Sequence, residues 1–551
     1  MRHSLLLLLH TACNAGTLSG TLSGPSLDDT ALPSDGGGDN GGGDGTADGG
    51  DEGGDDTAPP TPRCEPEITL PTPWYTEGDA ISLPIACTSG ADLADYSLQL
   101  TRGPEGAAIE GAAVVWAADR GDAGTIELTV IATLRSGGDA EPATARFWVA
   151  EDSDHPSNTP ADPLAYTEEW GLPVFHIQTG GGIGADYSAA TITFDGTAYS
   201  AEIKKRGASS YSYPKNSYTL RFADDENELD AEAYGIPEKK DHLVLVSTFD
   251  DNSFVRQKLS YDTWAAIAET LGEERLVIRS FFAVVYLNGA YVGLYVAIDR
   301  PDDEFVGQMG LSRDGNLYKS VNHDANFKTT AASGGGKGSW HQGYLKKEGA
   351  SLDDFSDLDA LISKAATTPA SDFMAVASDY IYTPDFMDWW LLVHVIDAGD
   401  SGGKNAWLYN DPTGPMQFRY CPWDMNHSFG QDWMTLRVGS SSNNDFTWTN
   451  NIFAHILNDP ASREALFDRY QRLRAEGPYQ PGWYTDTLDE YYALIEPSAQ
   501  RDWDRWGDDY RGYWWASYRG DDWNDFEGEK AYLYDWLESR IDQLDVWYPP
   551  E

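Results

Sequence analysis

The segment between Phe386 and Gly430 constrains the fold of this chain more than any other. Residues 386–396 are almost entirely apolar and have the length of a helix that is buried on all sides. An acidic, glycine-rich loop follows, and a further carboxylate, Asp424, stands directly after a short predicted strand. In phosphate-binding sites, Mg²⁺ is commonly held by one or two carboxylates together with the phosphates. The pattern therefore predicts a metal–phosphate site after the helix.

Two polar side chains in the loop are spaced as in the catalytic loop of protein kinases. Asp400 and Asn405 are five residues apart. In kinases an Asp at this spacing orients the acceptor hydroxyl, the Asn binds magnesium, and a later Asp holds the metal against the phosphates. Asp424 is placed for that last role. Because Asp and Asn beside glycine are also common turn formers, the spacing alone leaves both interpretations open.

Further motifs accompany this segment in a characteristic order. They are LPVFHI at 172–177, KRGASS at 205–210, YPKNSY at 213–218, LNGAYVGLY at 287–295 and PWD at 422–424. Together they make the chain resemble the CotH spore-coat kinase family over residues 165–546. The resemblance implies an atypical protein-kinase-like α+β fold with two lobes, an antiparallel β N-terminal lobe and a mainly helical C-terminal lobe. It also implies ATP- and Mg²⁺- or Mn²⁺-dependent phosphoryl transfer to Ser or Thr of an unidentified protein substrate.

The resemblance also implies nucleotide-binding residues in the N-terminal lobe. Lys215 opens a predicted strand from which its ammonium can reach phosphate oxygens, although a solvated lysine at a strand edge would give the same pattern. Arg256 would brace a phosphate or an acidic partner, and a surface salt bridge is the alternative. The turn after residue 205 would cover the nucleotide with its amides and hydroxyls. The expected set is Lys215, Arg206, Gly207, Ser209, Ser210 and Arg256.

In the second lobe, the resemblance implies that Asp400 is catalytic and that Asn405, Asp424 and Asn426 bind the metal. Asn426 stands where the family carries a second Asp. Its amide oxygen can ligate magnesium but brings no charge, so a pseudokinase remains an alternative. Lys319 also matches the family, but the sequence assigns it no role.

Net charge limits the partners of the protein. The 551 residues include 89 acidic and 38 basic side chains, which give a formal charge of −51. Nucleic acids and anionic membrane surfaces favour clusters of Lys and Arg, so neither is an expected partner. Basic protein substrates and divalent cations fit this balance better.

The N-terminus predicts export. Residues 1–13 combine a positive start, a short leucine run and small residues before Cys13, as in a signal peptide with a lipobox-like cysteine, although His10 departs from the lipobox pattern. Residues 14–62 are rich in Gly and Asp and predict a disordered tether. We therefore expect a protein of the cell envelope or cell surface whose membrane contact is a lipid on Cys13.

Residues 64–151 alternate apolar and polar residues in several short stretches separated by turn residues. This pattern is typical of a small immunoglobulin-like β-sandwich. In an exported chain, Cys64 and Cys87 could form a disulfide across it, whereas Cys421 is expected to be a buried thiol.

Within residues 165–546, the periodicity predicts mainly strands before residue 300 and mainly helices after it. Strands are expected at 174–178, 190–194, 199–206, 217–222, 243–246, 277–287, 291–298, 405–410 and 416–420, and helices at 254–271, 352–365, 371–380, 384–396, 451–457, 462–475, 484–495 and 526–544. A second function class remains open beside the kinase. The tether, the sandwich and the Trp- and Asp-rich segment 501–525 are also compatible with a non-catalytic surface binding or adhesion protein.

Overall fold

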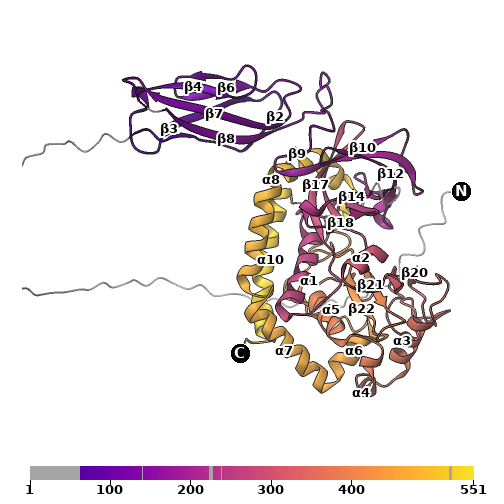
Figure 1. Cartoon of the computed structure of the whole chain (residues 1–551). Helices are drawn as coiled ribbons and strands as arrows, with labels where there is room; N and C mark the ends of the chain where they lie inside the picture. The colour runs from indigo at the N-terminus through magenta and orange to yellow at the C-terminus, as the bar shows by residue number, and fades with distance from the viewer. Residues whose placement is uncertain (1–62, 139, 223–227, 238, 520–523, 551) are drawn as a thin grey trace, which may run out of the picture.

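The computed structural model describes residues 63–550 except 139, 223–227, 238 and 520–523 (Figure 1). The predicted signal peptide with Cys13 and the predicted tether over 14–62 lie outside the described residues. None of the helices in the described part of the chain is both long and apolar enough to span a membrane.

The first unit consists of two four-stranded sheets that share one core. One sheet has the order β1-β3-β6-β5 and the other β2-β8-β7-β4. Strand β3 alternates exposed and buried residues along its length, and Leu83, Val114 and Phe147 from the two sheets meet in the core. The strands are β1 (Pro66–Ile68), β2 (Trp74–Thr76), β3 (Ala80–Cys87), β4 (Tyr96–Arg102), β5 (Ala108–Glu110), β6 (Ala113–Ala117), β7 (Gly124–Leu134) and β8 (Ala140–Ala150).

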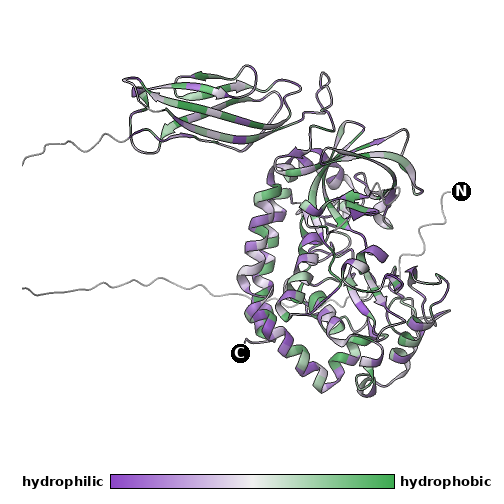
Figure 2. Cartoon of the chain, viewed as in Figure 1, coloured by the Kyte–Doolittle hydropathy of each residue, from purple (hydrophilic) through white to green (hydrophobic). Residues whose placement is uncertain are grey.

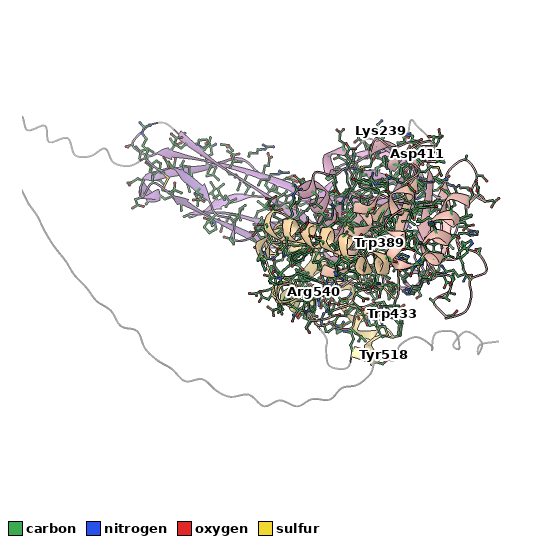
Figure 3. All side chains as sticks on the ribbon, turned by 90° about the horizontal axis from the view of Figure 1, so that it is seen from below. Lys239, Trp389, Asp411, Trp433, Tyr518 and Arg540 are labelled. Carbon is green, nitrogen blue, oxygen red and sulfur yellow. A yellow bond between two sulfur atoms is a disulfide. The ribbon has the colours of Figure 1, made fainter. Side chains whose placement is uncertain are left out.

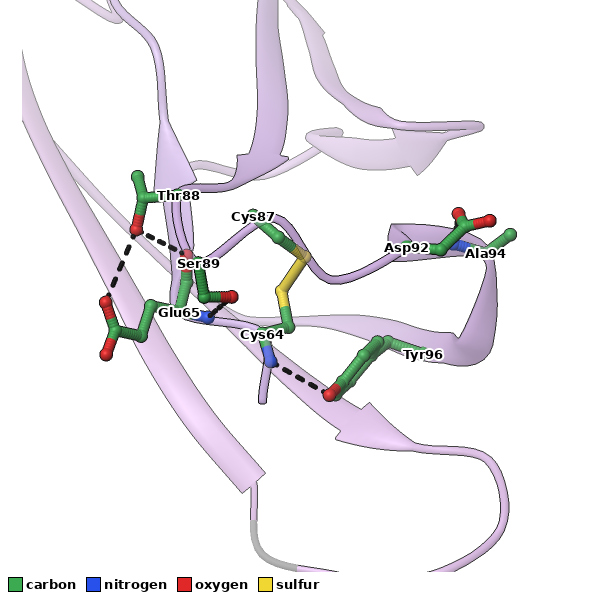
Figure 4. The surroundings of a disulfide bond; sticks show 8 residues. All are labelled: Cys64, Glu65, Cys87, Thr88, Ser89, Asp92, Ala94 and Tyr96. Carbon is green, nitrogen blue, oxygen red and sulfur yellow. Dashed lines mark hydrogen bonds between the residues drawn. A yellow bond between two sulfur atoms is a disulfide. The ribbon is translucent and has the colours of Figure 1, made fainter. Parts of the chain in front are cut away.

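A disulfide fastens the first strand of this unit. Cys64 and Cys87, the pair that the sequence suggests, are bonded with a Cα–Cα distance of 5.0 Å (Figure 4). The backbone N–H of Cys64 also donates to the hydroxyl of Tyr96 at 2.8 Å. Cys421, by contrast, is a free and fully buried thiol.

The second unit begins with a closed sheet of strands in the order β11-β12-β13-β16-β18-β17-β10, in which β10 also pairs with β11 and β9 extends one edge (Figure 1). The prediction of an antiparallel sheet was wrong in two respects: the sheet closes on itself, and β10 runs parallel to β17, with Val174 opposite Val284. The strands are β9 (Glu168–Glu169), β10 (Leu172–Thr179), β11 (Ser188–Phe194), β12 (Thr197–Arg206), β13 (Ser217–Phe222), β16 (His242–Val246), β17 (Ser280–Leu287) and β18 (Ala290–Asp299).

The closed sheet is apolar on both faces, which explains how it connects to the rest of the chain. Phe175 and Val285 point into a core enclosed by the sheet. Their neighbours Val174 and Val284 belong to a second, larger core that continues into the helices. Because successive side chains of a strand point to opposite faces, these strands are buried along nearly their whole length. The closed sheet and the helical part therefore share one continuous core.

The remainder of the chain is mainly helical and contains a four-stranded antiparallel sheet in the order β20-β19-β21-β22. Its strands are β19 (Asn316–Ser320), β20 (Tyr344–Glu348), β21 (Ala406–Asn410) and β22 (Arg419–Pro422), of which the first two were not predicted. The helices are α1 (Arg256–Leu271), α2 (Asp303–Gln308), α3 (Ser356–Thr367), α4 (Ala370–Phe373), α5 (Thr383–Val395), α6 (Asn451–Asn458), α7 (Pro460–Glu476), α8 (Pro481–Gly512), α9 (Ala516–Arg519) and α10 (Phe526–Trp547).

Helices α5 and α8 differ in how well the sequence predicted them. Every residue of α5 from Asp385 onward is buried, as its apolar run predicts. Helix α8 is 32 residues long and contains Pro497, whereas the prediction covered only 484–495. It packs against α10 and against β18 of the closed sheet and is amphipathic along its length (Figures 1 and 2). The first part of the Trp- and Asp-rich segment is thus helix, and Trp503 and Trp515 are buried.

Direct contacts tie the two-sheet unit to the closed sheet. The indole N–H of Trp170 donates to the carbonyl of Tyr75 at 3.1 Å, and that of Trp148 donates to Glu168 at 2.9 Å. Arg501 on α8 bonds Glu169 in β9 and the carbonyl of Glu151. The segment between the units is therefore flanked by ordered contacts.

Candidate active site

A cavity of about 570 Å³ lies between the closed sheet and the four-stranded sheet. The structure brings most of the predicted site residues together in it, although they come from segments nearly 200 residues apart in the chain. Lys215 and Arg256 do not line the cavity. The predicted residues that do are Arg206, Gly207, Ser209, Ser210, Asp400, Asn405, Asp424 and Asn426.

Asp400 follows α5 and faces a group of hydrogen-bond donors. Its carboxylate lies 2.6 Å from the Lys404 ammonium and 3.3 Å from Nε2 of His323, and it accepts from the Asn405 amide at 3.4 Å. Burial raises the pKa of Asp400, but hydrogen bonds from His323 and His427 and the nearby Lys404 charge lower it far below its usual value. Asp400 is therefore ionised at any physiological pH and can accept a hydrogen bond from a ligand hydroxyl.

Asp250 and His427 extend this network, and neither was predicted from the sequence. The Asp250 carboxylate accepts from Tyr213, from Asn426 and from Nε2 of His427, each at 3.0 Å. The other ring nitrogen of His427 is 3.8 Å from Asp400. Burial lowers the pKa of His427, but its two carboxylate neighbours raise it to about 10. No local motif marks Asp250, because its partners are some 40 to 180 residues away in sequence.

Asn405 and Asp424 share an uncommon backbone conformation. Their φ angles are +56° and +54°, in the left-handed region that Asn and Asp tolerate better than other non-glycine residues. The Asn405 amide donates to the carbonyl of Asp424 at 3.2 Å, which ties the two loops together. The same local preference that makes these residues turn formers thus helps to hold them at the cavity.

The side chains of Asn405, Asp424 and Asn426 together provide ligands that fit a divalent cation that prefers oxygen. The Asp424 carboxylate is partly exposed and makes no hydrogen bond or salt bridge with any described residue. The amide nitrogens of Asn405 and Asn426 are used as donors to Asp400 and Asp250, so both amide oxygens remain for a ligand. One carboxylate and two amide oxygens are ligands that Mg²⁺ and Mn²⁺ accept.

The turn after β12 forms one rim of the cavity. At Gly207 the φ angle is +113°, and a Cβ atom there would lie 2.1 Å from the hydroxyl oxygen of Ser210. Only glycine fits this close approach, and Ser209 and Ser210 of the same turn line the cavity. The Arg206 guanidinium lies over the Trp423 ring, 5.4 Å from its centroid.

The cavity concentrates positive charge in an otherwise acidic protein. Seven Lys and Arg side chains and three carboxylates line it, although the whole chain has 89 acidic and 38 basic residues. Lys404 is paired with Asp400, whereas the other six make no salt bridge with the described residues. The seven are Lys204, Lys205, Arg206, Arg300, Lys319, Lys347 and Lys404. Such a surplus of unpaired cations is suited to an anionic ligand with several charges.

Lys319 is the most enclosed of these cations. Its ammonium lies 5.0 Å from the Trp423 ring centroid and 5.6 Å from that of Trp407. Burial and the neighbouring Arg206 lower its pKa to about 8, while Asp424 opposes the shift. Lys319 matched the family motif without a role, and the structure places it where a lysine could hold phosphate oxygens beside Asp424.

Lys215 occupies a different place from the one predicted. Its ammonium is buried and donates to Asp502 on α8 and to the carbonyl of Leu294, both at 2.6 Å. Gly293 permits this approach, because a Cβ atom there would lie 2.2 Å from the Asp502 carboxylate. Lys215 therefore joins the closed sheet to α8 and is not available to a ligand in the cavity.

Arg256 supports the site from behind. It is completely buried, pairs with Asp251 at 2.7 Å and Glu529 at 2.6 Å, and donates to the carbonyls of Ser428 and Phe429. The structure shows the predicted contact of Arg256 with acidic partners. The side chain does not reach the cavity, so it cannot brace a phosphate there. Because Ser428 and Phe429 follow His427 directly, Arg256 holds the end of the segment that carries Asp424, Asn426 and His427.

Comparisons with known proteins identify part of this chain. The family model described as CotH kinase protein matches residues 203–544, which include every cavity-lining residue named above. No curated protein sequence matches the chain. Among solved structures, the comparison finds an endo-fucoidan hydrolase from glycoside hydrolase family 107. It is 12% identical in sequence, and the match covers 29% of this chain and 27% of that enzyme with a TM-score of 0.13. A variant of the same hydrolase gives 12% identity, 28% and 25% coverage and a TM-score of 0.12.

Proposed function

The chain belongs to the CotH kinase protein family, and on this premise we propose that it transfers a phosphoryl group from ATP to a Ser or Thr hydroxyl of a protein substrate. Mg²⁺ or Mn²⁺ would be the cofactor. The proposal includes a kinase-like two-lobed arrangement, with the closed sheet as one lobe and the helical part as the other, and an immunoglobulin-like first unit. It also includes export, lipidation of Cys13 and location in the cell envelope or at the cell surface.

One observation carries the proposal: six unpaired cations surround ionised carboxylates in a single cavity of a protein whose net charge is −51. Lys319 and Arg206 would bind the phosphates, and the Ser209 and Ser210 hydroxyls would contact them from the rim. Asp424, Asn405 and Asn426 would hold the metal ion. When bound, Mg²⁺ would neutralise phosphate charge during transfer.

The proposed transfer is an exchange of one P–O bond for another. The acceptor hydroxyl oxygen bonds to the γ-phosphorus, the bond to the ADP oxygen breaks, and ADP leaves with that electron pair. Asp400 orients the acceptor hydroxyl and receives its proton. His427, held protonated by Asp250 and Asp400, keeps the Asp400 carboxylate in place. A carboxylate with a strongly lowered pKa contributes mainly orientation, so positioning dominates this proposal.

A second function is favoured by one feature of the site. Asn426 provides no charge to the metal, and its amide N–H is already committed to Asp250. A protein with this site could bind ATP without transferring phosphate and act as a non-catalytic surface binding or adhesion protein. The two functions predict the same nucleotide binding but different phosphoryl transfer.

The test is incubation of the purified full chain with γ-labelled ATP and Mg²⁺ or Mn²⁺, alone and with candidate protein substrates. Label on a Ser or Thr residue supports the kinase. Asp400→Asn should retain ATP binding but slow transfer by a factor on the order of 10²–10⁴. Asp424→Ala should lose metal-dependent ATP binding while the fold is retained. ATP binding without any transfer by the wild-type protein supports the non-catalytic function, and no ATP binding would overturn both.

A further inference from the structure

A second group of ligand-type side chains lies outside the active-site cavity. Asp241 and His242 stand at the start of β16, and Asp302 precedes α2. One side-chain atom from each lies within 4.8 Å of the others. The two segments are 60 residues apart in sequence, so the closed sheet and the chain after it bring the group together.

One buried atom in this group has no partner, and two others face only each other. Oδ1 of Asp241 and Nδ1 of His242 lie 2.8 Å apart, whereas Oδ2 of Asp302 has no hydrogen-bond partner among the described residues. Asp302 is 3% exposed, and its other oxygen is already used to accept from the N–H of Phe305 at 3.0 Å. Buried polar atoms are nearly always paired, so the free oxygen of Asp302 beside the Asp241–His242 pair indicates a missing partner.

The neighbouring lysine does not supply that partner. Lys240 is 3.1 Å from Asp299 and 3.7 Å from Asp302, but the latter contact is to Oδ1, the oxygen that caps α2. A third carboxylate, Glu304, accepts from the N–H of Asp241 at 3.3 Å and lies beside the group. Lys240 therefore leaves Oδ2 of Asp302 without a hydrogen-bond partner.

We propose that Asp241, His242 and Asp302 form a binding site for a divalent transition-metal ion, with Glu304 as a further ligand. An imidazole nitrogen with carboxylate oxygens is a donor set that suits Zn²⁺ or Mn²⁺. It differs from the oxygen-only set at Asp424. The side chain of Asp241 is 36% exposed, which gives the ion a path from solvent.

The ion would join two walls of the active-site cavity. Strand β16 contributes Val244 and Val246 to the cavity lining, and Arg300 lies two residues before Asp302. A cation bound to both segments would fix the start of β16 against the turn that carries Arg300. The site is thus structural and stabilises the cavity without contacting the nucleotide.

The test is metal binding by the full chain in the absence of nucleotide. After chelator treatment and dialysis, the protein is titrated with ZnCl₂ and separately with MnCl₂, and bound metal and Tm are measured. We expect one equivalent to bind with a Tm increase of several degrees. His242→Gln and Glu304→Gln should each weaken this binding at least tenfold, because each removes a ligand while the α2 cap of Asp302 remains.

Two control variants separate this site from other sources of binding. Asp303→Asn changes a neighbouring carboxylate outside the group and should bind metal as the wild type does. Asp424→Ala removes the proposed catalytic metal ligand and should also retain the equivalent. The proposal is overturned if the wild type binds no metal, if binding survives in both His242→Gln and Glu304→Gln, or if it is lost in Asp424→Ala. Circular dichroism checks that each variant is folded.

Discussion

Two lysines reach from the sheets into the interior, and their surroundings differ in one respect. Lys215, behind the closed sheet, is paired with Asp502 and a backbone carbonyl at 2.6 Å. Lys319, in the cavity, lies beside two tryptophan rings without a salt bridge to any described residue. A buried charge is costly unless it is paired, so the fold itself satisfies the first lysine, and a ligand must satisfy the second.

The electrostatics of the two regions follow this difference. Burial lowers the pKa of Lys215, but Asp502 opposes the shift and keeps the pair together. Burial and Arg206 lower the pKa of Lys319 to about 8. Unsatisfied charge of this kind is common at functional sites. Between two lysines in family-like motifs, the one that lacks a partner is therefore the better candidate for phosphate binding.

The largest expected effect concerns the paired lysine. Lys215→Met should lower the free energy of unfolding by about 3–5 kcal/mol, because it leaves the Asp502 carboxylate buried without its cation. Chemical denaturation measures this loss. Lys215→Met combined with Asp502→Asn should recover part of it, since no buried charge then remains. If the Lys215→Met protein has normal stability but cannot bind ATP, then Lys215 and not Lys319 is the lysine that serves the ligand.

Lys319→Met should affect binding instead of folding. ATP affinity should fall about 10- to 100-fold, the range expected when one charge-assisted hydrogen bond is lost. Lys337→Met is the matched control, because burial also lowers the pKa of that lysine to about 8 but it does not line the cavity. Isothermal titration with ATP and Mg²⁺ compares the two variants. Equal affinities in both would exclude Lys319 as a phosphate ligand.

The pH dependence of the free energy of unfolding tests whether the Lys319 charge lacks a partner. The pKa of Lys319 is about 8 in the folded protein and near its ordinary 10.5 when unfolded. Between these two pH values the unfolded chain binds more protons than the folded protein. Lys319 therefore lowers the free energy of unfolding by its full amount below pH 8 and has no such effect above pH 10.5. Without nucleotide, Lys319→Met should be more stable than wild type by on the order of 2 kcal/mol at pH 7.

That difference should disappear as the pH rises to 10.5. Measuring the difference between the two proteins removes the contribution of His427, whose raised pKa makes its stabilisation fall as the pH passes about 10. Denaturation curves at pH 7, 9 and 10.5 provide the data. A difference that is independent of pH would mean that the Lys319 charge is already satisfied in the folded protein.

Ionic strength should give the smallest effect. Raising NaCl from 0.05 to 0.5 M should weaken ATP binding about three- to tenfold, because the cations at the cavity rim are screened. The denaturation midpoint should change little, since the Lys215–Asp502 pair is shielded from salt by burial. ATP affinity that does not respond to salt would indicate that the rim cations contribute nothing.

Exposed aromatic residues outside the cavity show that the Trp- and Asp-rich segment is not entirely core. Trp433 and Trp514 lie with their ring centroids 6.0 Å apart and are nearly half exposed, and Tyr518 is 61% exposed (Figure 3). Trp503 and Trp515 are buried, as expected for aromatic cover over a core. Burial within this segment depends on which side chains meet the rest of the fold, as Trp515 meets Tyr213 and Phe249, and composition does not specify that.

The sequence by itself determined the elements whose signals are local. The helix α5, the two paired strands on either side of Asn288 and Gly289, and a common site for Asp400, Asn405 and Asp424 were all predicted, because each depends on periodicity or a short motif. The motif set also predicted membership in the CotH family, which the match over 203–544 confirms. The ends of long elements such as α8 were poorly predicted, because no local signal in the sequence marks them.

Only the tertiary structure decided which charges meet. The parallel pairing of β10 with β17, the contact between Asp250 and His427, and the pairing of Lys215 with Asp502 join residues 110, 177 and 287 positions apart. A lysine in or just before a strand looks the same in sequence whether it faces Asp502 or an open cavity. The free energy of a buried charge depends on its neighbours in space, so its availability to a ligand is fixed only when the chain has folded.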